Sequence, residues 1–188
     1  VTKQVSFYEE MTNVPFIIAG PGIHPRQKPV EDLLTQPTID LLPTLCELAG
    51  IPVPSSKPGI SLAPFLKGEK QKRQHPYAAS EWHSEYEVTV SPGRMIRSPR
   101  YKYTHYLEGN GEELYDMLKD KGERRNLAHD PKSSKILAEH RALLDDYIRR
   151  TQDDYRSLKV EADKRWRSHA PGYPNHEGPC ARDIINRK

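Results

Sequence analysis

The stretch SPGRMIRSPRYKYTHYLEGNGEELYD, residues 91–116, decides the fold class of this chain. It contains three of four short, tyrosine-rich segments, and turn formers at Ser91–Gly93 and Gly109–Gly111 separate them. The four segments are Tyr77–Trp82, Arg94–Arg97, Tyr101–Tyr106 and Glu113–Asp116. Short β-prone segments joined by turn residues are typical of antiparallel meanders. The stretch therefore predicts a small antiparallel β-sheet.

A helix is predicted directly after this sheet, at about residues 131–150. Asp130 suits the N-cap position and Pro131 the first helical position. Apolar side chains then recur on one face at helical spacing. They are Ile136, Leu137, His140, Leu143, Leu144, Tyr147 and Ile148. We expect this face to cover the sheet, which gives a carboxy-terminal subdomain over residues 77–151.

The residues before the sheet indicate a different layer, over residues 1–76. The segment at about 14–19 is apolar on both faces, which is typical of a strand covered by helices. A helix follows at about 39–49, in which Pro43 is compatible only with the first turn. A Pro- and Gly-rich connector leads to residue 76. The sequence therefore predicts an α/β layer here, and a polar, basic tail over residues 152–188.

The composition limits the classes of function. The 188 residues carry a net charge of +3 and are 35% hydrophobic, below the ~45–50% of an average globular domain. The longest apolar run, Val14–Ala19, is far shorter than the ~20 residues of a membrane-spanning helix, so no membrane span is expected. Acidic residues interrupt the basic residues of the tail, which argues against a nucleic-acid partner. Cys46 and Cys180 lack metal-ligand spacing.

The chain holds no complete catalytic motif. A Gly-x-Ser-x-Gly elbow, a phosphate-binding loop, a dinucleotide fingerprint and a His-Glu-x-x-His pair are all absent from the sequence, and these are the common signatures of hydrolases, nucleotide enzymes and metalloproteases. The residues alone therefore indicate an α/β chain without a nucleophile of its own.

Three local sequences, taken in order, resemble the carboxy-terminal portion of type I sulfatases, the arylsulfatase family of the alkaline-phosphatase superfamily. The first is Asn13–Gly22, with Lys3 and Phe7–Glu10 before it. The second is Gln36–Ile51, followed by Gly59–Leu62 and Leu66–Gly68. The third comprises Arg94–Arg97, Tyr101–Tyr103, Glu113–Asp116 and Glu123–Ala128. The resemblance extends from residue 1 to about residue 150.

The resemblance implies an alkaline-phosphatase-like α/β fold and a formylglycine/calcium mechanism. The family makes its formylglycine in Cys/Ser-x-Pro/Ala-x-Arg and holds Ca²⁺ with Asp and Asn/Gln side chains. Neither motif occurs here, and Cys180-Ala181-Arg182 has the wrong spacing. The resemblance thus places nucleophile and metal ligands outside this chain, in the amino-terminal portion of the same enzyme. This chain alone is then expected to be inactive. The family also favours an extracytoplasmic location.

The resemblance suggests five site residues. Lys3 matches a family lysine that contacts the sulfate, where an ammonium would stabilise developing charge; the alternative is a solvated terminal lysine. Trp82, His83, Arg97 and His105 are candidates for binding the leaving group, because an indole supports a sugar ring and arginine suits anionic oxygens. The alternative is that Trp82 fills the interface between sheet and helix and His83 is solvated.

These features together predict hydrolysis of a sulfate ester on a small molecule or glycan, with a carbohydrate sulfate preferred. Two other classes remain open at this point. The parent protein could be a phosphodiesterase or phosphonate hydrolase of the same superfamily, or the chain could be a non-catalytic binding module.

Overall fold

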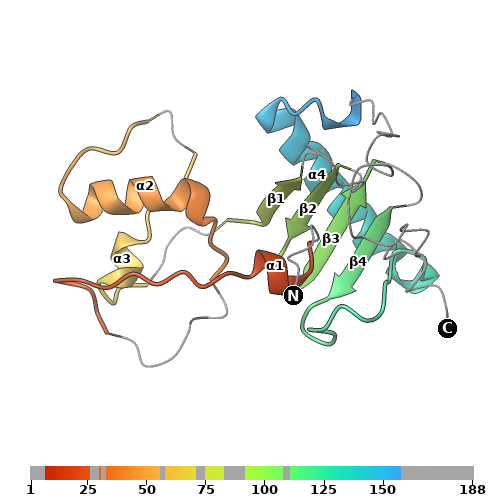
Figure 1. The fold of residues 1–188 in the computed structure, drawn as a ribbon, viewed down its shortest axis with the longest axis horizontal. Helices are drawn as coiled ribbons and strands as arrows, with labels where there is room; N and C mark the ends of the chain where they lie inside the picture. Colours follow the sequence, from red (N-terminus) through yellow and green to blue (C-terminus); the bar gives the residue numbers. More distant parts are fainter. Residues whose placement is uncertain are drawn as a thin grey trace, which may run out of the picture.

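The computed structural model describes residues 7–25, 30, 33–55, 58–70, 75–82, 92–107 and 111–157. The chain forms two parts that lie side by side (Figure 1). One part contains helices α2 (Pro37–Leu48) and α3 (Ala63–Leu66). The other contains a four-stranded sheet, with the short helix α1 (Glu9–Thr12) and the long helix α4 (Ser134–Thr151).

The predicted antiparallel meander is confirmed. Its strands are β1 (Ala78–Trp82), β2 (Gly93–Arg97), β3 (Tyr101–Tyr106) and β4 (Glu112–Asp116), in the order β1-β2-β3-β4. Each strand pairs antiparallel with the next, so that Ile96 lies opposite Tyr103 and Tyr103 opposite Leu114. Because side chains alternate along a strand, this register brings these three residues onto one face of the sheet.

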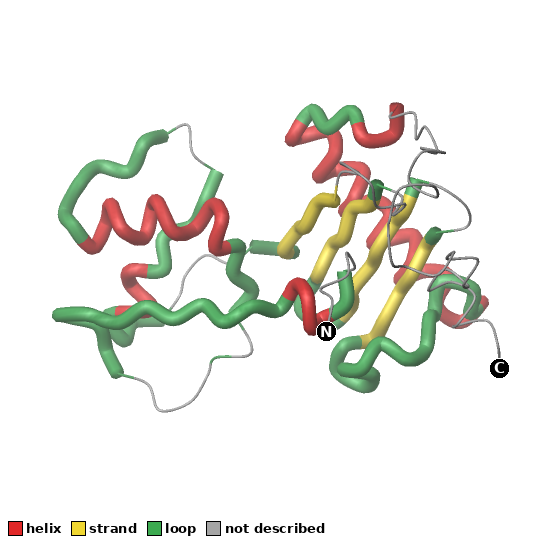
Figure 2. Tube along the Cα trace, viewed as in Figure 1, coloured by secondary structure: helices red, strands yellow, loops and turns green. Residues whose placement is uncertain are grey.

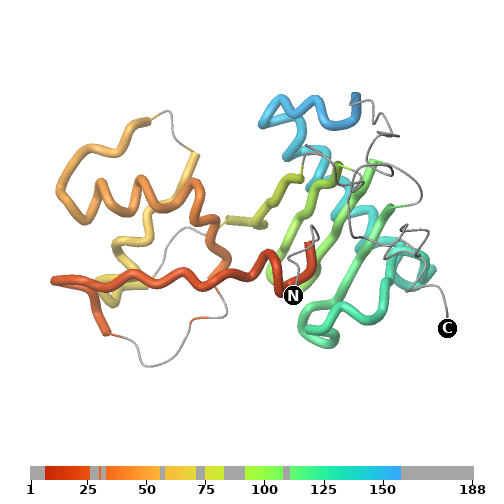
Figure 3. Tube along the Cα trace, in the orientation of Figure 1, coloured from red at the N-terminus to blue at the C-terminus, as the bar shows by residue number. Residues whose placement is uncertain are grey.

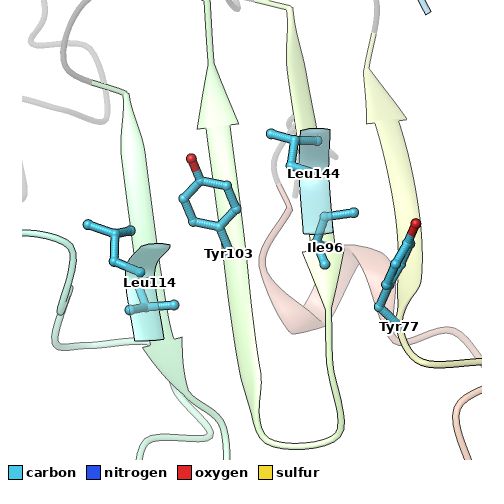
Figure 4. Packing of buried hydrophobic residues seen from close by; sticks show 6 residues of the cluster. Tyr77, Ile96, Tyr103, Leu114 and Leu144 are labelled. Atoms are coloured by element: carbon cyan, nitrogen blue, oxygen red, sulfur yellow. The ribbon is translucent and has the colours of Figure 1, made fainter. Parts of the chain in front are cut away.

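The hydrophobic core lies between this face and α4, as the sequence predicts. Six buried residues form it (Figure 4): Tyr77, Ile96, Tyr103, Leu114, Leu137 and Leu144. The last two come from the predicted apolar stripe of α4, and the other apolar residues of the stripe pack around them. Asp130 caps the short helical turn Pro131–Ser133 by accepting a hydrogen bond from the Lys132 backbone N–H (3.0 Å). The predicted helix is therefore confirmed.

The residues directly after α4 still contact the sheet. Asp153 receives two hydrogen bonds from Arg94, at 2.6 and 2.9 Å, and the Tyr155 ring lies under the same guanidinium at 4.4 Å. Arg94 is only 2% exposed and Tyr155 is fully buried. Residues 152–157, which the sequence assigns to the tail, thus pack on the α4 face of the sheet.

Helix α2 confirms the helix predicted at about 39–49. Its pattern of burial is the reverse of the usual amphipathic helix, in which the apolar side is buried and the polar side is exposed. Asp40 is 0% exposed and accepts hydrogen bonds from the backbone N–H groups of Gln36 (2.7 Å) and Ile60 (2.8 Å). Leu41 and Leu45 instead face outward, at 41% and 50% exposed. The helix therefore buries a polar side against the connector and presents an apolar side to the exterior.

The structure corrects two expectations in this part of the chain. Val14–Ala19 is not a strand: it is a loop (Figure 2), and Ile17 is 86% exposed. A strand requires a hydrogen-bonded neighbour, and no described strand pairs with this segment. Pro43 lies inside α2 rather than in its first turn. The loop then runs along the α2–α3 part (Figure 3), where the His24 N–H donates to the Leu66 carbonyl (2.7 Å).

Candidate functional site

The sheet face opposite α4 carries a cluster of charged side chains, which we call the Lys102 cluster: Lys102, Glu9, Glu123 and Arg97. Strand alternation brings Lys102 and Arg97 to this face, because their neighbours Tyr103 and Ile96 point to the core. Lys102 and Arg97 also lie opposite each other in the register of β2 and β3. Two basic residues thus adjoin on a face covered by α1.

The Lys102 ammonium is surrounded by oxygen atoms. It donates a hydrogen bond to the Phe7 carbonyl (2.8 Å) and lies 2.7 Å from Glu9 Oε1 and 2.8 Å from Glu123 Oε1. Glu123 Oε1 has the distance of an ion pair without the angles of a hydrogen bond, so that contact is mainly Coulombic. Lys102 is 0% exposed. A buried ammonium is stable only when paired in this way.

Glu123 also holds α1. Its other carboxylate oxygen accepts a hydrogen bond from the Glu9 backbone N–H (2.7 Å), at the first residue of that helix. Glu123 has a φ of 50°, in the left-handed region that non-glycine residues rarely adopt. Such backbone strain persists only when surrounding contacts maintain it. The contacts to Lys102 and Glu9 are the ones that do so here.

Of the two basic residues in the cluster, Arg97 has its positive charge less fully balanced by nearby carboxylates. Its Nε lies 3.8 Å from Glu9 Oε1, and its Nη1 donates to the neighbouring Ser98 carbonyl. Burial lowers the pKa of Arg97, and the charges of Glu9 and Glu123 oppose that effect. The guanidinium still carries its charge, because arginine remains protonated even when its pKa falls. The cluster therefore offers a half-buried positive charge close to α1.

Glu113 adds a third acidic side chain to the same face, from β4. Burial raises the pKa of Glu113 to about 7, and repulsion from Glu123 contributes, while Lys102 acts in the opposite direction. A carboxyl with such a pKa exchanges its proton near neutral pH. The charge balance of this face thus changes between mildly acid and mildly basic solution.

Trp82 lies on this face too, but at the other end of the strands. It pairs in register with Gly93, whereas Arg97 pairs with Ala78 at the opposite end of β1. The indole Nε1 is buried and has no hydrogen-bond partner among the described residues. The position of Trp82, away from α4, contradicts the alternative in which this side chain fills the interface between sheet and helix.

His105 belongs to the opposite face. Its Nδ1 lies 2.6 Å from the Tyr155 hydroxyl, which is also 2.8 Å from the His105 carbonyl. Burial lowers the pKa of His105, with Glu112 acting in the other direction. The structure therefore places Trp82 and Arg97 on one face and His105 on the other, so these predicted residues do not converge on one site. Lys3 and His83 lie outside the described residues.

The sequence analysis missed Lys102 and Glu123. A signal for Lys102 was present, since a lysine between Tyr101 and Tyr103 must point away from the face that those tyrosines cover. Glu123 gave no such signal, because only the tertiary structure brings its turn beside α1. No rule based on residue spacing predicts a contact of this range, since Glu9 and Glu123 are 114 positions apart.

Within the described residues, no group of three or more His, Cys, Asp or Glu side chains could hold a metal ion. Nor does any helix in the described ranges combine the length and apolar character of a membrane-spanning segment.

Comparisons with known proteins agree on one family. Residues 3–150 match the family described as N-sulphoglucosamine sulphohydrolase, C-terminal. The Delta 4,5-hexuronate-2-O-sulfatase of Bacteroides thetaiotaomicron is 76% identical over all 188 residues, which cover 39% of that relative. Arylsulfatase K of Homo sapiens is 33% identical over 134 residues, covering 66% of this chain and 24% of the relative.

The solved structures give the same result. The structure of a 2-O GAG sulfatase superposes with a TM-score of 0.84 at 76% identity, and the match covers 98% of this chain and 40% of that one. The chain thus spans well under half the length of the relatives that it matches.

Proposed function

The chain belongs to the N-sulphoglucosamine sulphohydrolase C-terminal family of type I sulfatases, and from this membership we propose that it forms the carboxy-terminal part of an enzyme that hydrolyses carbohydrate sulfate esters. The observation that carries the proposal is the 76% identity, over the whole chain, to a Delta 4,5-hexuronate-2-O-sulfatase. At this level of identity we extend the proposal to a substrate class, a 2-O-sulfated hexuronate. The family model and the two curated relatives reported above are sulfatases, which disfavours the phosphodiesterase or phosphonate hydrolase alternative.

The exposed apolar surface of the α2–α3 part supports a covalently linked neighbour. Leu41, Leu42 and Leu45 are all exposed on α2, and Val14 and Ile17 are exposed on the preceding loop. Several exposed large apolar side chains of this kind are typical of an interface. We propose that the amino-terminal portion of the enzyme covers it and supplies the strand neighbours that Val14–Ala19 lacks. This favours a subdomain over a self-contained binding module.

The proposal keeps the division predicted from sequence. Residues 1–76 form the end of the large α/β domain and residues 77–151 form the sheet subdomain. Residues 152–188 form a tail whose first residues pack on the sheet. The formylglycine and Ca²⁺ of the family would be held by the amino-terminal portion and would supply the nucleophile and the sulfate-binding charge. This chain would supply Lys3 to the sulfate.

The charges of this chain suit such a substrate. A hexuronate 2-O-sulfate is anionic at both its carboxylate and its sulfate, and hydrolysis breaks the bond between sulfur and the sugar oxygen. An ammonium at Lys3 would stabilise negative charge that develops on the sulfate or leaving oxygen. Trp82, His83 and Arg97 remain candidates for the leaving-group pocket, with Arg97 as a partner for the carboxylate. His105 is left out of this pocket, since it lies against Tyr155.

A chimera tests the proposal. This chain would replace the aligned segment of the Bacteroides thetaiotaomicron relative, and sulfate release from a Δ4,5-hexuronate 2-O-sulfate disaccharide would be measured by ion chromatography. We expect the chimera to hydrolyse the disaccharide, and Lys3→Ala to lower kcat by about 100-fold, as removal of one stabilising donor does. A folded chimera that releases no sulfate would refute the proposal.

A second measurement uses the 188-residue chain alone. If the amino-terminal portion normally covers the apolar side of α2, this chain should bind an apolar dye such as ANS, and the double substitution Leu41→Lys/Leu45→Lys should reduce the binding. A cooperative melt without dye binding would instead favour the independent binding module.

A further inference from the structure

The contacts of His75 lead to an inference about how the two parts of the chain are held together: we propose that His75 is a positioning residue for Arg97. Its hydrogen bond to buried Asp40 fixes β1 against the α2–α3 part, and thereby fixes the place of Arg97 on the neighbouring strand. The consequence for the substrate rests on the proposed function, in which Arg97 is a partner for the hexuronate carboxylate.

The carboxylate of Asp40 is the centre of this contact. Asp40 is fully buried, and only 11% of the His75 side chain is exposed. Asp40 Oδ1 lies 2.7 Å from His75 Nε2 and accepts the Ile60 N–H at 2.8 Å, and Oδ2 accepts the Gln36 N–H at 2.7 Å. Because a carboxylate only accepts hydrogen bonds, His75 Nε2 carries the hydrogen in this pair. Asp40 thus joins the start of α2, the connector and the residues before β1.

A second hydrogen bond reaches β1 itself. The Ala79 N–H donates to Gln36 Oε1 (3.0 Å), and the N–H of the same Gln36 is bound by Asp40. β1 is an edge strand of the sheet and the strand nearest to the α2–α3 part (Figure 1). Backbone groups on the outer side of an edge strand have no strand partner, and the Gln36 side chain supplies one here. Asp40 therefore holds β1 by two routes, directly through His75 and indirectly through Gln36.

The connection between His75 and the sheet is short and stiff. Pro76 follows His75 and limits its backbone to extended conformations. Tyr77 comes next, and its side chain is buried in the hydrophobic core. A contact made at His75 is therefore transmitted to β1 with little freedom.

The hydrophobic core does not extend across the junction between the two parts. Its six residues all belong to the sheet subdomain, whereas Leu41 and Leu45 of α2 face outward. Hydrogen bonds are directional, unlike apolar contacts. We therefore assign the orientation of the sheet subdomain to the hydrogen bonds at Asp40.

Arg97 lies next to this contact. In the register of β1 and β2 it is opposite Ala78, which adjoins Ala79. A displacement of β1 would move Arg97 as well, because the hydrogen-bonded ladder joins the two strands. An arginine that binds a carboxylate through two parallel N–H donors depends on its position and angle. A loosened β1 should therefore weaken the binding of an anionic leaving group.

Hydrogen exchange of the chimera, followed by mass spectrometry, tests the contact. His75→Leu removes one donor to Asp40 and leaves the two backbone donors in place. We expect exchange in a peptide spanning residues 75–82 to become about 10-fold faster, the effect of losing one hydrogen bond to a charged group. A peptide spanning β3 should not change.

Two further variants serve as controls. His75→Gln carries an amide N–H that can donate in place of Nε2, and it should restore exchange to within about 2-fold of the unsubstituted chimera. His129→Leu makes the same substitution at an exposed histidine, in the turn before α4, and should leave exchange in residues 75–82 unchanged.

Unchanged exchange in residues 75–82 of His75→Leu would overturn the inference. Equal acceleration in β3 would do the same, because it would show a general loss of stability. Should His75→Leu fail to fold, Gln36→Ala removes only the acceptor of the Ala79 N–H. It should accelerate exchange in the same peptide by about 3-fold, and an unchanged rate in this variant would count against the inference.

The kinetics of the chimera test the effect on Arg97. We expect His75→Leu to raise KM for the disaccharide by about 3- to 10-fold and to change kcat by less than about 2-fold, since the sheet subdomain would bind the leaving group while the amino-terminal portion supplies the nucleophile. Arg97→Gln should also raise KM. Once Arg97 is replaced, His75→Leu should raise KM by less than about 2-fold further. Fully additive increases would contradict a role through Arg97.

Failure of the inference and failure of the proposed function give different results. A folded chimera that releases no sulfate refutes the proposed function, and hydrogen exchange still decides whether His75 holds β1. Unchanged KM in Arg97→Gln would remove Arg97 from the leaving-group pocket, and with it this inference. Unchanged KM in His75→Leu, with raised KM in Arg97→Gln, refutes the inference alone and leaves the proposed function intact.

Discussion

Gly59 packs directly against the backbone carbonyl of Ile39 in α2: a Cβ atom added to Gly59 would lie 1.9 Å from that oxygen. The contact follows from Pro43, which stands four positions after Ile39 inside the helix. Proline has no N–H, so the Ile39 carbonyl lacks its helical hydrogen-bond donor. The connector can approach this side of the helix because residue 59 has no side chain.

Gly59→Ala should therefore destabilise the protein. The methyl group cannot fit without moving the connector away from α2, which also disturbs the hydrogen bond from the Ile60 N–H to Asp40. We expect a loss of about 2–4 kcal/mol in the free energy of unfolding, measured in urea. Gly20→Ala is the matched control, because a Cβ there meets no atom within 4 Å. An equal, small effect of both substitutions would contradict the prediction.

Glu112 should stabilise the fold in a pH-dependent way. Arg141 and the Tyr103 hydroxyl donate hydrogen bonds to its carboxylate, and the Arg141 contact is the main cause that lowers the pKa of Glu112 to about 2 from 4.5. A lowered folded-state pKa contributes stability that is present above the unfolded pKa and is lost as the pH falls.

Glu112→Gln is therefore expected to lower the free energy of unfolding at pH 7 by about 0.5–1.5 kcal/mol, a discounted figure because Arg141 is half exposed. The difference from the unsubstituted protein should shrink between about pH 4.5 and pH 2. Urea unfolding at several pH values measures it. A constant difference over this range would count against the assignment.

The contribution of Glu113, the next residue of β4, to stability should change with pH in the opposite direction. Its side chain points to the other face of the sheet, where burial and then Glu123 raise its pKa to about 7. A raised folded-state pKa contributes stability that is fully present below the unfolded pKa and is lost as the pH rises through about 7. Ionised Glu113 is thus a cost to the fold at alkaline pH.

Glu113→Gln, which cannot ionise, should become more stable than the unsubstituted protein by about 1–3 kcal/mol at pH 8 and should differ little near pH 4. Because Glu112 and Glu113 are adjacent, each variant serves as the control for the other. Parallel pH profiles of the two variants would show that the environments of the two faces do not differ as described.

Asp153→Asn should destabilise the protein much more than Asp154→Asn. Asp153 receives the bidentate contact of buried Arg94, and loss of its charge leaves that guanidinium poorly compensated, a change that typically costs about 3–5 kcal/mol when a buried pair is broken. Asp154 is exposed. Thermal unfolding followed by circular dichroism measures both. Equal melting temperatures would mean that the segment after α4 does not stabilise the sheet.

Much of the sheet subdomain could be predicted because its signals are local. Tyr101–Tyr106 coincides with β3, and the apolar stripe of α4 packs where its spacing indicates. The strand predicted at Val14–Ala19 depended instead on neighbours that a sequence pattern cannot supply. Its apolar residues indicate burial, but in the described structure Val14 and Ile17 are exposed.

The same distinction between local and tertiary information applies to the predicted site residues. The family resemblance suggested Arg97 and His105 together, but the strand register places them on opposite faces of the sheet. The amino-acid sequence by itself determined the periodicity of each strand and helix, the caps and the turns, because these depend on residues a few positions apart. Only the tertiary structure decided which charges meet. The contact of Lys102 with Glu9 and Glu123 depends on strand register and on the path of a distant turn, since electrostatic pairing acts through space.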